Sequence, residues 1–152
     1  MSITYSQAVD EINTMFLNAW NANSNAIAGY IPEIRWEGNE REPIPDNKLF
    51  WCRASIKSVL EQQASLANSV GIPGQRIFTA HGLVIVQLFC PKNVLNSLPV
   101  GRQLAGVAQN AFRGKASPGG VWFLNVTVKD FPQEENWYRL NVVAQYSYDE
   151  IH

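Results

Sequence analysis

Few residues in this chain have the types and spacing that catalysis requires. Its two histidines are His81, which lies within a strand-like run beside Gly82, and His152, the last residue. A nucleophilic pair would need Cys52 or Cys90 beside His81. Both cysteines lie in apolar runs, where burial raises the pKa of a thiol and opposes its reactivity. The sequence therefore predicts two reduced, buried cysteines, a structural histidine and no catalytic residue.

Motifs for metals, phosphates and cofactors are also missing from the sequence. Cys52 and Cys90 lie far apart in the chain and have no neighbouring histidine or cysteine with the spacing of a zinc site. The glycine-containing run 71–76 lacks the Gly-Lys-Ser/Thr ending of a phosphate loop. We therefore expect no metal, no cofactor and no enzymatic activity. One alternative stays open, an enzyme that uses His81 together with a carboxylate.

Hydrophobic periodicity predicts two helices. The first spans about residues 5–22, with Thr4 as its N-cap and Gln7 completing a capping box. The polar run 21–25 is expected to end this helix, because its side chains compete for backbone hydrogen bonds. The second helix spans about residues 98–113 and precedes a glycine that is placed to stop it.

Alternating and apolar runs predict the strands of one sheet. They are residues 34–37, 49–60, 77–90, 121–129 and 137–148. The run 77–90 is nearly all apolar, which is typical of a central strand. Short turns between successive strands favour antiparallel pairing. We therefore expect an α+β fold with a mostly antiparallel sheet of about five strands and two main helices packed on one face, as a single domain over residues 1–152.

Charge is balanced in total and uneven along the chain. The 12 basic and 13 acidic residues give a net charge of −1, which indicates no electrostatic affinity for nucleic acid or membranes. Residues 1–50 are acidic, residues 53–115 are basic, and residues 116–152 are acidic again. Such a dipolar subunit suits contacts between unlike faces. The plainer interpretation is that charges fall wherever surface is available.

Four basic residues are candidates for intermolecular contacts. Arg102 and Arg113 share one face of the second predicted helix, Lys115 follows that helix, and Arg76 lies in the loop 68–76. Basic residues without base-reading partners contact phosphates at most, so no specific nucleic-acid binding is expected. At each position, an ordinary solvated side chain is the alternative.

The aromatic residues do not predict a stacking platform for bases, which would need exposed rings. Trp51, Trp122, Trp137 and Tyr138 fall in predicted strands, where packing in the core is expected. Among all the aromatic residues, Trp36 and Trp137 are the two for which partial exposure is expected most. The chain also has no apolar run near 18 residues and no secretory signal at its start, so we expect a cytoplasmic protein without membrane association.

Several strand runs resemble a family of phage-encoded proteins. The run 82–91, Gly-Leu-Val-Ile-Val-Gln-Leu-Phe-Cys-Pro, is similar to the central strand of that family. Further matching runs are residues 51–53, 111–114, 121–126, 137–142 and 146–150. Together they cover about residues 49–150, and the first helix matches more weakly. The family is a group of tailed-phage and prophage proteins similar in layout to the tail terminator, or tail completion, proteins of lambda-like phages.

The resemblance implies a structural protein of the virion. Tail terminators are α+β subunits without catalytic residues that form a six-subunit ring on the last ring of the tail tube. The ring ends polymerisation and offers a surface to the head–tail connector. The implied partners are further copies of the chain, the tail-tube protein and the connector protein, in the bacterial host cytoplasm during assembly and then in the virion tail.

The resemblance also assigns expected roles to the basic residues and loops. Arg102, Arg113 and Lys115 would line a lumen through which DNA passes without being gripped, and Arg76 would contact a neighbouring subunit. Of the loops 38–48, 68–76 and 115–120, one would reach the tail tube and another a neighbouring subunit. Two alternatives remain, another head–tail joining or neck protein and a monomeric protein-binding module.

Overall fold

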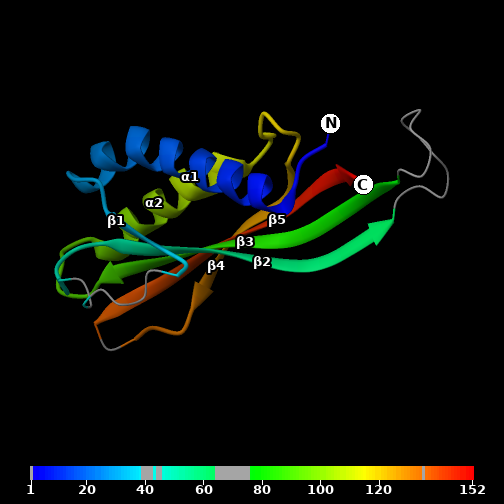
Figure 1. The fold of residues 1–152 in the computed structure, drawn as a ribbon. Coiled ribbons are helices and arrows are strands. Elements are labelled where there is room, and N and C mark those ends of the chain that lie inside the picture. The colour runs from blue at the N-terminus through cyan, green and yellow to red at the C-terminus, as the bar shows by residue number, and fades with distance from the viewer. Residues whose placement is uncertain (1, 39–42, 44–45, 64–75, 135) are drawn as a thin grey trace.

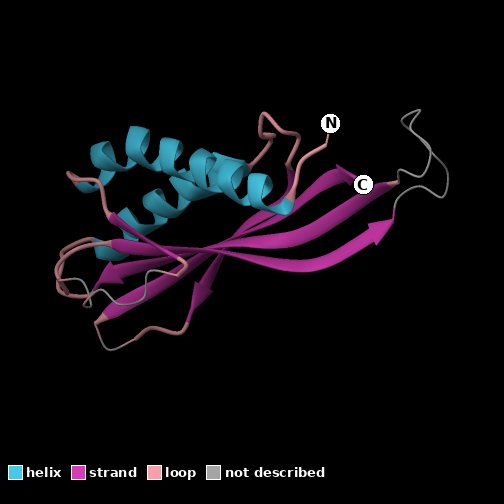
Figure 2. Cartoon of the chain, in the orientation of Figure 1, coloured by secondary structure: helices cyan, strands magenta, loops and turns pink. Residues whose placement is uncertain are grey.

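The chain folds into a layer of two helices over one face of a five-stranded sheet (Figure 1). The computed structural model describes residues 2–38, 43, 46–63, 76–134 and 136–152. In chain order the elements are α1 (Tyr5–Ala28), β1 (Glu33–Trp36), β2 (Trp51–Gln63), β3 (Ile77–Pro91), α2 (Ser97–Phe112), β4 (Trp122–Phe131) and β5 (Trp137–Ile151). Figure 2 shows both helices on the same side of the sheet, as predicted for the α+β class. No helix among the described residues is long and apolar enough to cross a membrane.

The sheet is mixed, which corrects the expectation of a mostly antiparallel one. The strand order is β1-β2-β3-β5-β4, and β3 is central, as predicted. β2 pairs with β3, β3 with β5 and β5 with β4 in antiparallel fashion, whereas β1 runs parallel to β2, with Glu33 opposite Trp51. A parallel pair needs a connection long enough to return to the same end of the sheet. The connection between β1 and β2, residues 37–50, has that length.

Helix α1 begins as predicted and ends later than predicted. Its capping box is present, with the Gln7 amide donating to the Thr4 hydroxyl at 3.2 Å. The helix continues through the polar run 21–25 to Ala28 because polar side chains in that run bond within the helix. The Ser24 hydroxyl, for example, donates to the carbonyl one turn earlier at 2.6 Å. The helix ends where Gly29 adopts a φ of 85°, which favours glycine.

The main core lies between the helices and the sheet. Its largest fully buried side chains are Trp20, Tyr146, Phe16, Phe112, Ile12, Leu88, Leu104 and Leu140. Trp20 is completely buried, and its indole N–H donates to the Pro32 carbonyl at 2.9 Å. Helix α2 comes close to the sheet because Gly101 has no side chain. A Cβ at Gly101 would lie 2.3 Å from the Cys90 sulfur.

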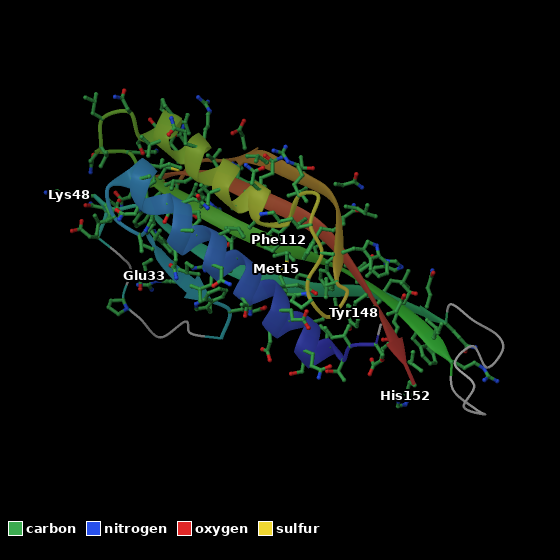
Figure 3. All side chains as sticks on the ribbon, turned by 90° about the horizontal axis from the view of Figure 1, so that it is seen from above. Met15, Glu33, Lys48, Phe112, Tyr148 and His152 are labelled. Atoms are coloured by element: carbon green, nitrogen blue, oxygen red, sulfur yellow. The ribbon has the colours of Figure 1, made fainter. Side chains whose placement is uncertain are left out.

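The strands β2, β3 and β5 extend past the helices at one end of the molecule (Figure 1). We call this end the tip and define it as residues 60–63, 76–80 and 149–152. The view from above shows Glu33 and Lys48 toward one end of the molecule and His152 at the other (Figure 3). At the tip, Arg76 and His152 exchange two backbone hydrogen bonds of 2.9 Å.

Candidate interaction site on the open face of the sheet

One face of the sheet lies against the helices, and the opposite face has no helix on it among the described residues (Figure 2). Side chains alternate between the two faces of a strand. Cys52, Val86 and Leu140 belong to the core under the helices, so their chain neighbours point the other way. We call this second surface the open face.

Three aromatic rings form a separate cluster on the open face. Trp51, Phe89 and Trp137 are only 4%, 4% and 7% exposed, yet they do not belong to the main core. Trp51 stacks on Phe89, its partner across β2 and β3, with 4.0 Å between ring centroids and 4° between planes. Trp137 meets both rings edge-on, at centroid distances of 6.0 and 6.2 Å. Such geometries add to the energy of burial alone.

Three arginines cover these rings. The guanidinium carbons of Arg35 and Arg53 lie 5.4 and 5.6 Å from the centroid of the Trp51 ring. Arg139 lies 5.3 Å from the centroid of the Phe89 ring. All three distances are within cation–π range. We call the six residues Arg35, Arg53, Arg139, Trp51, Phe89 and Trp137 the arginine–aromatic cluster.

The three arginines of the cluster differ in their surroundings. Glu33 lies 3.6 Å from Arg35, and Glu134 lies 3.1 Å from Arg139. The register of β1 and β2 places Arg35 opposite Arg53. Arg53 is exposed, whereas Arg35 and Arg139 are half-buried. Arg53 is therefore the guanidinium group of the cluster that is most open to an anion on another molecule.

The cluster also contains buried hydrogen-bond donors without an acceptor. Among the described residues, the indole N–H groups of Trp51 and Trp137 and the Nε of Arg139 have no hydrogen-bond partner. A buried donor left unpaired costs on the order of 1–3 kcal/mol. Within the described part of the chain, these three donors therefore carry a cost that the packing of the cluster must offset.

The other end of the open face is apolar and exposed. Val59 is 64% exposed, Leu124 55% and Trp122 36%, and they line a shallow cavity of about 340 Å³ with His81 and Ser147. The expectation that Trp122 packs in the core is wrong. β4 is an edge strand of the sheet, and Trp122 lies on its open face, where no described helix covers it.

The basic residues singled out by the sequence do not form one site. Arg102, Arg113 and Lys115 are exposed on α2 and just after it, in the helix layer. The Arg113 guanidinium donates to the Asn110 side chain at 2.7 Å. Arg76 lies elsewhere, at the tip. None of the four belongs to the arginine–aromatic cluster.

The predicted contact loops have different outcomes. Most of the loops 38–48 and 68–76 lies outside the described residues. The loop 115–120 is described, and its Gly119 amide donates to the Glu11 carboxylate of α1 at 2.5 Å. That bond holds this loop against the helix layer.

The two cysteines and His81, which were considered for catalysis, do not form a catalytic arrangement in the described part of the chain. Burial raises the pKa of Cys90 to about 12, and burial followed by the charge of Glu33 raises the pKa of Cys52. His81 Nδ1 lies 2.7 Å from the Ser147 hydroxyl. In the described part of the chain, no carboxylate hydrogen-bonds to His81 to complete a triad. No group of three metal-ligating side chains occurs there either.

The arginine–aromatic cluster was not predicted, although the sequence contains a signal for it. Tryptophan precedes arginine by two positions at 51–53 and again at 137–139, so within each strand both side chains share a face. Trp51 is buried as expected, but outside the core under the helices. The expectation that Trp137 is partly exposed is wrong, because Trp51 and Phe89 pack against it. Trp36 is partly exposed, as predicted.

Comparisons with known proteins bear on the fold alone. No family model matches the chain, and no curated protein matches it. A solved structure of a protein without a descriptive name is similar to it, with a TM-score of 0.52 and 12% sequence identity. The similarity covers 89% of this chain and 94% of the other. At that identity, the similarity concerns the arrangement of helices and strands.

Proposed function

We propose that this chain is a structural subunit of a phage tail, a tail terminator without enzymatic activity. In this role it assembles with further copies into a ring, caps the tail tube, ends its polymerisation and joins the tail to the head connector. The observation that carries the proposal is the open face. Exposed apolar side chains lie at one end of it and the arginine–aromatic cluster at the other. Apolar surface of this kind marks interaction sites.

A ring subunit must present two unlike surfaces, because a contact between different patches closes on itself only after several copies. The helix layer carries Arg102, Arg113 and Lys115, which are exposed. In the proposed ring these residues face the lumen and meet passing DNA without binding it specifically. The ring size of six comes from the resemblance to tail terminators.

Two other functions compete with this one. Another head–tail joining protein would use the same surfaces at a neighbouring position in the virion. A monomeric binding module would use the cavity beside Trp122 and Leu124 for a peptide. Only a terminator stops the growth of a tail tube.

The test polymerises the tail-tube protein of the same phage or prophage with and without this chain. A terminator shortens the tubes and adds a ring to their ends in negative-stain electron microscopy. Leu124→Ser on the open face should weaken capping, whereas Leu17→Ser on the exposed side of α1 should not. Leu17 is a matched control because it is also an exposed leucine, at 38%. Tubes of unchanged length with bare ends would overturn the proposal.

A further inference from the structure

The arginine–aromatic cluster and the tip lie at opposite ends of the same strands. β2 runs from Arg53 toward Glu61 at the tip, and β5 runs from Arg139 toward Glu150. At about 3.3 Å per residue, the first pair is roughly 25 Å apart and the second roughly 36 Å. Each protein molecule therefore carries both the arginine–aromatic cluster and the tip. The two are too far apart to contact each other in the same molecule.

The tip is acidic. Glu61, Asp149 and Glu150 lie on paired strands there, and Arg76 is the one lysine or arginine among the described tip residues. Ala80 of β3 lies opposite Glu61 on one side and opposite Tyr148 on the other, two residues before Glu150. The register therefore places Glu61 and Glu150 in the same region of the tip.

The cluster has the chemistry to receive carboxylates. Arginine binds a carboxylate through parallel N–H bonds. Arg53 is exposed, so its guanidinium group is open to a carboxylate of another molecule. Nucleic acid fits this place less well, because the rings are covered by arginines and offer no exposed face for base stacking.

We propose that the arginine–aromatic cluster of one copy binds the acidic tip of the next copy, so that subunits join head to tail. The inference rests on the proposed self-assembly and specifies its contact. The complementary charges are the argument for a second copy as the occupant. A contact between two different patches is heterologous. Every dimer formed in this way still has one free cluster and one free tip, so further subunits add until a ring closes.

The test uses one charge reversal on each side of the contact. Arg53→Glu changes the cluster, and the double variant Glu61→Lys with Glu150→Lys changes the tip. Arg53 and Glu61 are exposed and Glu150 is half-buried near the end of β5, and circular dichroism checks that both variants fold. Each variant alone should lose self-association at least tenfold. A mixture of the two should associate again, because the intact tip of one variant meets the intact cluster of the other, and the two reversed patches are also opposite in charge. Asp10→Lys on α1 is the control and should assemble like the unaltered chain.

A second measurement covers the case in which copies associate only weakly in the absence of the tail tube. Arg53→Cys and Glu150→Cys are mixed at high concentration with a short bismaleimide. A cross-linked dimer should form at least ten times faster than with Asp10→Cys in place of Glu150→Cys. The native thiols do not interfere, since Cys52 and Cys90 are buried. Equal cross-linking by both pairs, or unchanged assembly of the charge variants, would overturn the inference.

The two proposals fail separately. If the unaltered chain caps tail tubes but the cross-linking pairs behave alike, the head-to-tail contact is wrong and the function stands. If the predicted pair cross-links but tubes are never capped, the contact stands and the terminator function is wrong.

Discussion

Two glycines of α2 should respond in opposite ways to the same substitution. Gly101 and Gly106 are both inside the helix Ser97–Phe112. A Cβ at Gly101 would lie 2.3 Å from the Cys90 sulfur and 3.7 Å from Leu140 Cδ1, whereas a Cβ at Gly106 would meet nothing within 4 Å. Substituting these two glycines therefore tests how tightly α2 packs on the sheet. Arg102 follows Gly101 on this helix, so the packing also fixes the position of Arg102.

The magnitudes follow from two opposing effects. Alanine in place of glycine inside a helix gains about 0.5–1 kcal/mol. Adding a methyl group to a packed core costs about 1–3 kcal/mol. Gly106→Ala has only the gain, so its free energy of unfolding should rise by about 0.5–1 kcal/mol and its Tm by about 1–4 °C. Gly101→Ala has both effects and should lie about 1–3 kcal/mol below Gly106→Ala, because the helix gain is common to the two.

Urea denaturation of the two variants and the unaltered chain measures this difference. The variant Cys90→Ala supplies the further control, because it removes the sulfur that the new methyl group meets. Cys90→Ala lowers the free energy of unfolding in both backgrounds. The loss should be at least about 1 kcal/mol smaller in the Gly101→Ala background than in the unaltered chain. Equal stabilisation by Gly101→Ala and Gly106→Ala would refute the close packing of α2 against β3.

Three further predictions concern stability and thiol chemistry. Thr4→Ala removes the capping box of α1 and should lower the free energy of unfolding by about 1 kcal/mol in urea denaturation, and no change would contradict the role of this cap. Cys52 and Cys90 should react with a thiol reagent only after denaturant is added, and fast labelling of the folded chain would show that they are not buried. The free energy of unfolding should fall as pH rises above about 8.5, where cysteines of the unfolded chain ionise. In the folded chain the pKa values of Cys90 and Tyr146 are raised to about 12, so the folded state keeps protons that the unfolded state releases; flat denaturation midpoints across this range would disagree.

Local signals in the sequence were enough to predict most elements. The capping box at Thr4 located the start of α1, and the apolar run before Pro91 identified the central strand β3. The end of α1 was missed because Ser24 bonds to the helix itself, which composition does not reveal. The direction of β1 depends on the path of its connection to β2, and residue patterns carry no information about that path.

The candidate site was harder to predict than the fold. Aromatic residues in strands are usually placed in a single core, so Trp51 and Trp137 offered no reason to expect a second cluster. Their separation from that core follows from the sheet having helices on one face only. The pairing of Arg35 with Arg53 depends on the parallel register of β1, which no periodicity reports. The basic residues chosen from the sequence lie on α2 and at the tip instead.

Self-assembly is the central claim, and sedimentation velocity tests it most directly. The unaltered chain is measured from micromolar to millimolar concentrations beside Arg53→Glu. We predict that the 17.0 kDa monomer gives way to a closed species with a fixed multiple of that mass, and that Arg53→Glu stays monomeric at the same concentrations. A single 17.0 kDa species across the whole series for both proteins would contradict the account.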